Sequence, residues 1–332
     1  AALNMAIGAS YAGARAMVAT SGGGFALMVE ALSLAGMMET PVVIALAMRP
    51  GPATGMPTRT GQEDLAFALS AGHGEFPRLV LAPGSVGEAY ALAFHAMEMA
   101  EAHQVPCILL TDQYLADTTV DLDPEDLAVP PVRRRIVRGD AVPRDAEGRY
   151  LRYALSESGI SPMAVPGEPG ITVVADSDEH GEDGHITEDH GIRVRMVEKR
   201  LRKGREMARH VLPPVFSGDK TGDLLLVGFG STREIVAEAR GILERAGVFV
   251  GSDVQLVAPV TVGDGAVIGA GTMGRSIVAG LVASGKVRRS RITATDRSKV
   301  SAAEAASTFE VLPSLMSTVT LEKPTSALSL KG

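Results

Sequence analysis

Short apolar segments alternate with helical patterns from Ala1 to Asp121, and this alternation restricts the possible folds more than any other feature of the chain. The apolar segments are residues 16–20, 42–48, 78–81 and 107–111, and the helical patterns are residues 1–12, 25–38, 63–71 and 85–103. Buried strands that are separated by helices connect through right-handed crossovers, which makes the strands parallel. We therefore predict an α/β fold with a doubly wound parallel sheet for residues 1–122.

A glycine turn follows the first predicted strand. Thr20 and Ser21 end the apolar segment, Gly22 and Gly23 open the turn, and the next helical pattern begins at Phe25. This order places backbone N–H groups of the turn at the start of a helix, where they can bind an anion or the polar edge of a ring. The turn is therefore a candidate binding site.

Arg49 directly follows the second predicted strand, and a loop rich in proline and glycine comes after it. Ligands of open α/β sheets bind beyond the carboxyl ends of the strands, so we expect Thr20, Ser21 and Arg49 to converge on one crevice. The loop, residues 51–60, carries hydroxyl groups and Arg59, and we expect it to close over this crevice.

The composition argues against several classes of protein. The net charge of −7, from 32 Lys and Arg residues against 39 Asp and Glu residues, disfavours nucleic acid as the main partner. No apolar stretch is long enough and free enough of charge to predict a membrane span. The first residues lack the features of a secretory signal and look like the middle of a helix, as though the chain had been cut upstream. We expect a cytoplasmic protein of about two domains.

The single cysteine and two basic runs are expected to have no catalytic role. Cys107 lies in an apolar segment, which predicts a buried, inert thiol. One cysteine also excludes a disulfide framework and an iron–sulfur cluster held by this chain alone. The basic residues 133–135 and 199–205 are interpreted as solvated surface or as a charged contact with another subunit.

Residues 123–215 are rich in proline and charge, and we interpret them as an irregular connector. Within it we predict strands at 149–154 and 171–174 and an amphipathic helix at 192–209. An acidic loop in the same region holds His180, His185 and His190. Metal binding is one interpretation of this loop, but the spacing fits no compact zinc pattern, so we favour a solvated loop or a domain contact.

Residues 216–247 predict one strand (224–227), a glycine turn and a helix (232–246), which would begin a second α/β domain. Residues 248–332 remain uncertain, because two short patterns overlap there. The first is a hexapeptide repeat that resembles the β-helix of bacterial N-acetylglucosamine-1-phosphate uridyltransferases, and its members are Val250, Leu256, Val262 and Ile268. The second is a G-x-G-x-x-G turn that resembles the start of pyrroline-5-carboxylate reductase, and its members are Gly269, Gly271 and Gly274, with Arg297 placed to suit a 2′-phosphate.

A series of separated motifs in residues 1–247 resembles the α subunit of the 2-oxoacid:ferredoxin oxidoreductases, most closely the 2-oxoglutarate type. The motifs are TSGGGFALMVE, RPGPATGMPTRTGQEDL, GHGEFPRLVLAPGS, TDQYLAD, YALSESGISPMAVPG, DEHGEDGHITED and LLLVGFGS. The resemblance implies thiamine-dependent oxidative decarboxylation of a 2-oxoacid, transfer of electrons to ferredoxin, and release of carbon dioxide and an acyl-coenzyme A.

The resemblance also implies roles for the residues of the predicted crevice. Thr20, Ser21, Gly22 and Gly23 would bind the pyrimidine part of thiamine diphosphate, and Arg49 would hold the substrate carboxylate. Thr54, Gly55 and Arg59 would belong to a loop near the substrate or coenzyme A. A β subunit would hold the diphosphate with Mg²⁺ and the iron–sulfur cluster, and an acid that engages the aminopyrimidine would precede Ala1. No catalytic residue and no metal ligand is therefore assigned to this chain.

Two other functions remain open from the sequence. Residues 269–298 would make the chain an NAD(P)-dependent reductase if the G-x-G-x-x-G turn binds a dinucleotide. Alternatively, the chain would be a non-catalytic scaffold that only docks to a β subunit. Which 2-oxoacid is used is not determined by the sequence, because an arginine recognises the carboxylate that all 2-oxoacids share.

Overall fold

The computed structural model describes residues 1–213, Val215, Ser217, residues 224–246 and five short strands further along the chain. The helices are α1 (Ala2–Tyr11), α2 (Gly22–Ala26), α3 (Val29–Met37), α4 (Leu65–Ser70), α5 (Val86–His103), α6 (Gln113–Asp117), α7 (His190–Ala208) and α8 (Arg233–Arg245), with 3₁₀ turns η1 (Pro124–Leu127), η2 (Gly139–Ala141) and η3 (Gly230–Thr232). The strands are β1 (Met17–Ser21), β2 (Val42–Met48), β3 (Arg78–Leu81), β4 (Pro106–Asp112), β5 (Leu224–Val227), β6 (Val250–Gly251), β7 (Ala258–Val260), β8 (Ile292–Thr295), β9 (Leu312–Ser314) and β10 (Val319–Glu322).

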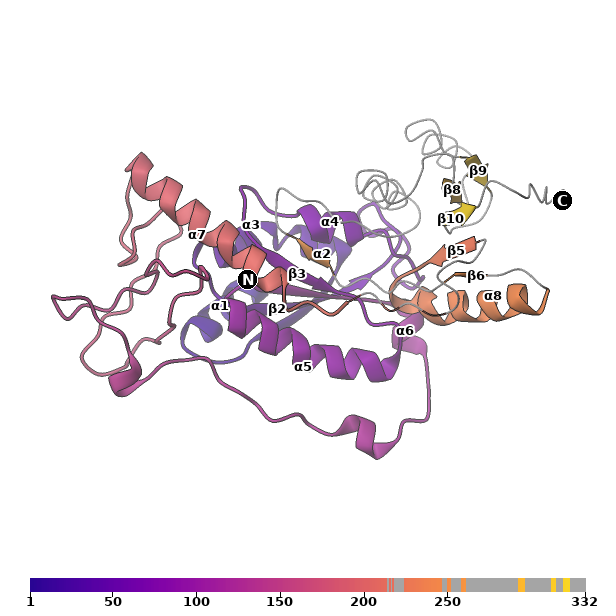
Figure 1. Cartoon of the computed structure of the whole chain (residues 1–332), viewed down its shortest axis with the longest axis horizontal. Coiled ribbons are helices and arrows are strands. Elements are labelled where there is room, and N and C mark those ends of the chain that lie inside the picture. Colours follow the sequence, from indigo (N-terminus) through magenta and orange to yellow (C-terminus); the bar gives the residue numbers. More distant parts are fainter. Residues whose placement is uncertain are drawn as a thin grey trace.

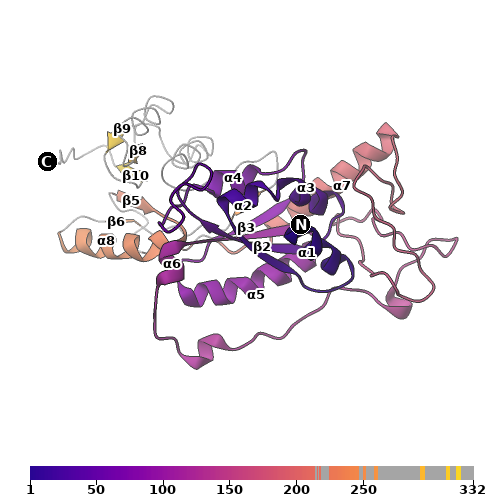
Figure 2. The same ribbon diagram turned by 180° about the vertical axis from the view of Figure 1, so that it is seen from behind.

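The first sheet has the strand order β1-β2-β4-β3-β7, in which the first four strands are parallel and β7 is antiparallel to β3. Helices cover both of its faces, with α5 on one side and α4 on the other (Figures 1 and 2). The predicted doubly wound α/β fold is therefore confirmed for this part of the chain. A second sheet has the order β6-β5-β10-β8-β9.

The apolar residues of the central strands divide between two cores, as the period of two in a β-strand requires. In β2, Ile44 and Leu46 face the core that contains α1, α3 and α4, whereas Val43 faces the core that contains α5. Ile108 and Leu109 of β4 divide in the same way. This burial on both faces explains why the strands are continuous apolar runs in the sequence.

Cys107 lies in the second core and is fully buried, and burial raises the pKa of its thiol. The prediction of an inert thiol is confirmed.

The predicted helix at 25–38 is wrong in one respect, because the structure breaks it. Helix α2 ends at Ala26 and α3 begins at Val29, with Leu27 and Met28 between them. Leu27 is 89% exposed, so the break turns an apolar side chain away from the core. The predicted strands at 149–154 and 171–174 are also wrong, because both segments are irregular in the structure.

The connector is held to the first domain by buried charges rather than by strands. Glu39, in the turn between α3 and β2, accepts hydrogen bonds from Lys199 at 2.7 and 2.8 Å and from Lys203 at 2.6 Å. Arg152 donates to the backbone carbonyl of Glu39 at 2.8 Å and to the side chain of Gln104 at 2.9 Å. All four charged side chains are at most 2% exposed. We call Glu39, Arg152, Lys199 and Lys203 the buried charge cluster.

This cluster corrects the interpretation of residues 199–205 as solvated surface or subunit contact. Only part of the basic run is exposed, because every third or fourth residue of α7 turns inward. Two of the inward residues, Lys199 and Lys203, share the carboxylate of Glu39, and Arg200 pairs with Glu179, which a count of charges along the sequence does not reveal.

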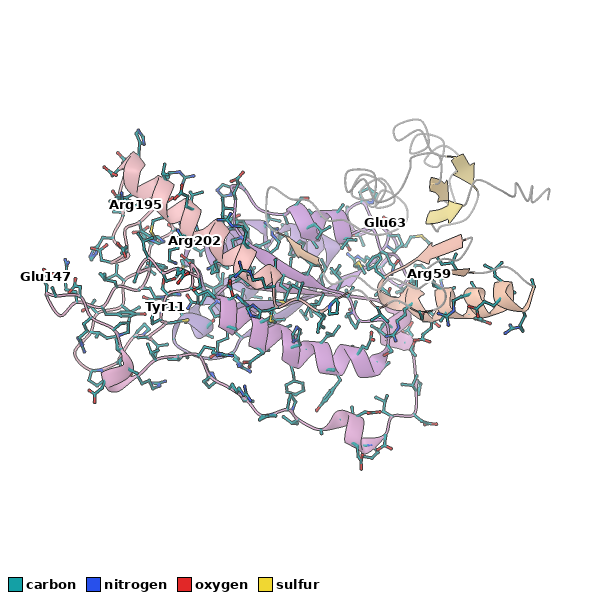
Figure 3. The ribbon with its side chains drawn as sticks, in the orientation of Figure 1. Tyr11, Arg59, Glu63, Glu147, Arg195 and Arg202 are labelled. Carbon is teal, nitrogen blue, oxygen red and sulfur yellow. The ribbon has the colours of Figure 1, made fainter. Side chains whose placement is uncertain are left out.

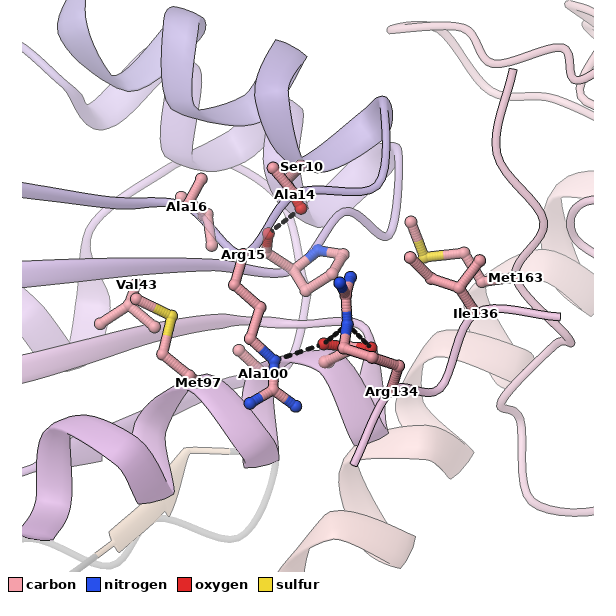
Figure 4. A pocket seen from close by; sticks show the side chains of 13 residues that line it. Ser10, Ala14, Arg15, Ala16, Val43, Met97, Ala100, Arg134, Ile136 and Met163 are labelled. Atoms are coloured by element: carbon pink, nitrogen blue, oxygen red, sulfur yellow. Dashed lines mark hydrogen bonds and ion pairs between the residues drawn. The ribbon is translucent and has the colours of Figure 1, made fainter. Parts of the chain in front are cut away.

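The basic run 133–135 is exposed, as predicted for solvated surface, and it also forms ion pairs with the first domain. Arg15 and Arg134 point at one carboxylate in a narrow crevice at the amino ends of β1 and β2 (Figure 4). That carboxylate belongs to Glu101, which accepts from Arg15 at 2.6 Å and from Arg134 at 3.1 Å. These contacts lower the pKa of Glu101 against the effect of burial, which raises it.

The acidic loop with three histidines forms the predicted domain contact. His180 is buried and stacks on Tyr153 with ring centroids 3.9 Å apart, whereas the side chain of His185 is 68% exposed beside Asp183. Glu179 of the same loop binds Arg193 and Arg200 of α7. Within the described residues, no group of three or more His, Cys, Asp or Glu side chains is arranged to hold a metal.

The patterns predicted at 248–332 fall mostly outside the described residues. The hexapeptide positions Leu256, Val262 and Ile268 and the glycines of the G-x-G-x-x-G turn are among those that the structure does not describe. Strand β8 lies between the G-x-G-x-x-G turn and Arg297 in the sequence. None of the described helices combines the length and the apolar character that crossing a membrane requires.

Candidate functional site

The carboxyl ends of β1 and β2 lie side by side and bring the glycine turn next to Arg49. The two strands are paired in parallel, with Ser21 opposite Ala47. Arg49 is two residues beyond Ala47, so it leaves the sheet at the same edge as Ser21. The convergence that was predicted from the two strand ends is therefore present in the structure.

A Cβ atom would clash with a neighbouring side chain at Gly22 and at Gly24 of the glycine turn, whereas at Gly23 it would make ordinary contacts. A Cβ atom on Gly22 would lie 2.3 Å from Oδ1 of Asp64, and one on Gly24 would contact the hydroxyl of Thr20. A Cβ atom on Gly23 would lie 3.6 Å from a terminal nitrogen of Arg49 and 3.4 Å from the carbonyl oxygen of Ala53. The turn therefore presents bare backbone between a guanidinium group and a carboxylate.

The guanidinium group of Arg49 has no carboxylate partner among the described residues. Its Nε atom is buried and has no hydrogen-bond acceptor there. A buried guanidinium nitrogen without an acceptor is costly, because the group loses hydration without replacing it. An incoming carboxylate would satisfy it, and the planar arrangement of N–H donors suits a carboxylate well.

Asp64, directly before α4, lies beside Gly22 and binds the backbone of Arg49. Its Oδ2 accepts the backbone N–H of Arg49 at 3.4 Å. Burial raises the pKa of Asp64, while the Arg49 N–H and charge lower it and Glu63 raises it further. The carboxylate is thus half-buried without a direct ion pair.

The loop between Arg49 and Gln62 is folded on itself and exposed. Met56 donates its N–H to the carbonyl of Pro50 at 3.1 Å, and Gly51 donates to the carboxylate of Glu63 at 2.8 Å. Gly55 has a φ of 54° and a Cβ there would clash with the carbonyl of Pro50, so this position requires glycine.

The three loop residues that the resemblance assigned belong to this exposed loop, which approaches the glycine turn through the carbonyl of Ala53. Thr54, Gly55 and Arg59 are all exposed, and Figure 3 shows Arg59 on the side of the molecule near α8. The structure therefore brings Thr20, Ser21, Gly22, Gly23 and Arg49 together. The remaining candidates lie on the loop that follows Arg49. Their roles stay predictions.

The turn that precedes α8 packs on the same edge of the first sheet. Gln62 donates its side-chain amide to the carbonyl of Phe229 at 2.9 Å, and Phe229 is buried in the core that contains α4. The hydroxyl of Ser231 donates to the carboxylate of Asp112 at the end of β4. Residues 229–231 therefore pack against this edge of the sheet, next to the loop that follows Arg49.

Reasoning from the sequence missed Gln62, Asp64 and Asp112 as residues of this edge. Asp112 ends a buried strand and caps α6 by accepting from Leu115 at 3.0 Å, which is a pattern that could have marked it. Asp64 directly precedes an apolar helical segment, which could have suggested a cap. Its side chain instead contacts Arg49 and the glycine turn, and no sequence pattern predicts that.

Comparison with known proteins identifies the fold of this site. The family described as pyruvate flavodoxin/ferredoxin oxidoreductase, thiamine diP-bdg, matches residues 1–199, which is more than half of the chain. The chain belongs to this family. The resemblance found in the sequence motifs is thereby confirmed, and the edge of β1 and β2 lies within the matched thiamine diphosphate-binding region.

Two similar relatives are named as subunits of oxidoreductases. The chain is 45% identical over 254 residues to "2-oxoacid:ferredoxin oxidoreductase 2, subunit alpha" of Aeropyrum pernix, covering 75% of this chain and 38% of the relative. It is 34% identical over 252 residues to "2-oxoglutarate oxidoreductase subunit KorA" of Mycobacterium tuberculosis, covering 74% of this chain and 37% of the relative. The chain thus spans less than half the length of these relatives.

A solved structure agrees with the sequence relatives. The 2-oxoglutarate:ferredoxin oxidoreductase from Magnetococcus marinus, which was solved with 2-oxoglutarate, coenzyme A and succinyl-CoA bound, matches with a TM-score of 0.68 and 34% identity. The match covers 76% of this chain and 43% of that one.

A second family matches the other end of the chain. It is described as NADP oxidoreductase, coenzyme F420-dependent, and it covers residues 265–324. This range contains the G-x-G-x-x-G turn and Arg297. The match supports the dinucleotide interpretation of these residues over the hexapeptide repeat.

Proposed function

We propose that this chain acts as the α subunit of a cytoplasmic 2-oxoacid:ferredoxin oxidoreductase, with 2-oxoglutarate as the favoured substrate. The reaction is the oxidative decarboxylation of the 2-oxoacid to carbon dioxide and an acyl-coenzyme A, with reduction of ferredoxin. A β subunit supplies the diphosphate site with Mg²⁺ and the iron–sulfur cluster. The observation that carries the proposal is the buried, acceptor-free Nε of Arg49 beside the glycine turn of a thiamine-binding family.

The residues at this edge are suited to the roles in cofactor and substrate binding that the proposal assigns to them. Thiamine diphosphate, when bound, supplies the chemistry that breaks the bond to the departing carboxylate. Ser21, Gly22 and Gly23 offer bare backbone and a hydroxyl to the polar edge of the pyrimidine, and Thr20 packs behind them. Arg49 orients the 2-oxoacid through its carboxylate.

The exposed loop has a separate part in the proposal. Thr54, Gly55 and Arg59 lie on it and are exposed, so we place them where coenzyme A or the outer end of the substrate approaches. The cationic side chain of Arg59 near this path would attract the phosphates of coenzyme A.

The function is tested by co-expressing the chain with a thiamine-binding β subunit and measuring 2-oxoglutarate-dependent reduction of a viologen dye. Replacing Arg49 with alanine should raise KM for the 2-oxoacid on the order of 10- to 100-fold, because a hydrogen-bonded ion pair with the substrate contributes roughly 1.5 to 3 kcal/mol. Arg49→Lys should recover only part of this loss, because lysine lacks the planar fork.

The matched control is Arg245→Ala, at the exposed end of α8 away from this edge. It should leave KM unchanged. An unaltered KM in Arg49→Ala would refute the assigned role of the arginine. Stable binding of the β subunit without turnover by any combination of the two chains would instead favour the scaffold function.

A second candidate function, NAD(P)-dependent reduction, is favoured by the family match at residues 265–324. Titration with NADPH should then enhance the fluorescence of the nicotinamide ring. Arg297→Ala should weaken NADPH binding about tenfold or more and leave NADH binding unchanged, because only NADPH carries the 2′-phosphate. Equal affinity of the variant for both dinucleotides would agree with this function, and no binding of either by the unaltered chain would exclude it.

A further inference from the structure

Asp64 occupies a position between the two halves of the proposed site. Its Oδ1 fills the space above Gly22, where a Cβ atom would come within 2.3 Å of it. Its Oδ2 accepts the backbone N–H of Arg49. One half-buried side chain therefore contacts both the glycine turn after β1 and the first residue after β2.

Two neighbours of Asp64 make different contacts. Glu63 holds the N–H of Gly51 at the start of the exposed loop, and Gln62 holds the carbonyl of Phe229 in the turn before α8. Three successive residues thus fix three different parts of the carboxyl edge. Only Asp64 reaches the residues that are assigned to the cofactor and the substrate carboxylate.

Asp64 could accept a hydrogen bond from the backbone or from the side chain of Arg49, and the choice decides which donors remain for a substrate. A carboxylate beside an arginine usually pairs with the guanidinium group, which would occupy the donors that a substrate needs. Here the carboxylate binds the backbone N–H, and no described acid pairs with the guanidinium. Asp64 therefore fixes the main chain of Arg49 and leaves its side-chain donors open.

We propose that Asp64 is a positioning residue for substrate binding, which holds Arg49 at a fixed distance from the glycine turn. This inference rests on the proposed function for its effect on KM, whereas its effect on the backbone of Arg49 does not depend on that function. Asp64 neither touches the substrate nor supplies a proton. It acts through Arg49 and Gly22.

The first test is independent of catalysis and follows amide hydrogen exchange at Arg49 in the full chain. Asp64→Ala removes the acceptor and should speed exchange of the Arg49 N–H by about tenfold or more. The N–H can then exchange without first breaking a hydrogen bond. Asp64→Asn keeps an acceptor oxygen of the same shape and should exchange nearly as slowly as the unaltered chain. Unchanged exchange in Asp64→Ala would overturn the inference.

The second test is a double-mutant cycle on KM in the complex with the β subunit. Asp64→Ala should raise KM for 2-oxoglutarate about tenfold and change kcat much less, and Asp64→Asn should restore most of the affinity. Gly22→Ala should also raise KM, because its Cβ displaces the carboxylate. In the Asp64→Ala background that second effect should vanish, since no carboxylate remains to be displaced.

The possible outcomes separate the two proposals. If Arg49→Ala leaves KM unchanged while Asp64→Ala speeds exchange at Arg49, the proposed function fails and the positioning contact stands. If Arg49→Ala raises KM and Asp64→Ala does not, the inference about Asp64 is wrong and the proposed function stands. Multiplicative effects of Gly22→Ala and Asp64→Ala would show that the two residues act independently, which also contradicts the inference.

Discussion

Replacing Glu39 with glutamine should lower the free energy of unfolding by about 3 to 5 kcal/mol, because it removes the only carboxylate of the buried charge cluster. Lys199 and Lys203 would keep their buried positions and lose their counter-ion. Arg152 would keep its carbonyl and amide acceptors, so the connector would stay attached at that contact. The loss should therefore weaken the attachment of α7 to the first domain.

The pH dependence of this loss follows from the groups involved. Burial lowers the pKa of Lys203 to about 7, and Glu39 opposes that shift. In Glu39→Gln the lysines shed protons more readily, whereas they remain charged in the unfolded chain up to about pH 10.5. Above the folded-state pKa of a lysine the unfolded chain binds more protons than the folded chain, so both proteins gain stability as the pH rises, and this gain begins at a lower pH in the variant. The stability deficit of the variant should therefore be largest just above about pH 4.5 and should shrink as the pH rises toward about 7.

The stability at acidic pH provides an independent test of the role of Glu39. The two lysines hold the pKa of Glu39 well below its usual value, although burial alone would raise it. A lowered folded-state pKa stabilises the protein above about pH 4.5, and that contribution is lost as the pH falls further. Denaturant unfolding curves across this range should therefore show a shallower acid loss in Glu39→Gln than in the unaltered chain.

The control is Glu30→Gln, an exposed carboxylate in the first turn of α3, which should change the stability by less than about 0.5 kcal/mol. A triple variant with Glu39→Leu, Lys199→Met and Lys203→Met should recover much of the lost stability, because no unpaired charge remains. Equal stability of Glu39→Gln and the unaltered chain would mean that the lysines do not depend on this carboxylate.

The sheet of the first domain could be predicted from the sequence because its signals are local. Residues 42–48 and 78–81 are apolar on both faces and lie between helical patterns, and the structure has strands with the same bounds. The meeting of Ser21 and Arg49 could also be predicted, because parallel strands place their carboxyl ends at one edge. This prediction required only the further assumption that β1 and β2 are neighbours in the sheet.

The rest depended on partners that are distant in the sequence. Lys199 is basic in a helix that looks solvated, and its partner Glu39 lies 160 residues earlier. The connector contains apolar residues that suggested strands, but the buried charge cluster and the His180–Tyr153 stack hold it instead. Asp64 is likewise defined by a neighbouring strand and a glycine turn. Such contacts are consequences of the fold, so a pattern within one segment does not reveal them.

Phe25→Ala should cost about 3 to 5 kcal/mol of stability, the usual range for deleting a buried aromatic side chain and leaving a cavity. Phe25 is completely buried and meets the ring of Phe67 edge to face, with centroids 5.1 Å apart. It therefore joins the short helix of the glycine turn to α4, the helix that begins directly after Asp64. Thermal or urea unfolding would measure the loss.

The same substitution should affect the site more than its distance from the ligand suggests. Phe25 lies one turn beyond Gly22, so a cavity beneath it lets the glycine turn shift relative to Asp64 and Arg49. Thiamine diphosphate should then bind the complex more weakly than expected from the folded fraction alone. The control is Leu27→Ala. Because Leu27 is 89% exposed, this substitution should change neither the stability nor the affinity for the cofactor. Loss of stability with unaltered cofactor affinity would show that the turn is held in place without its aromatic anchor.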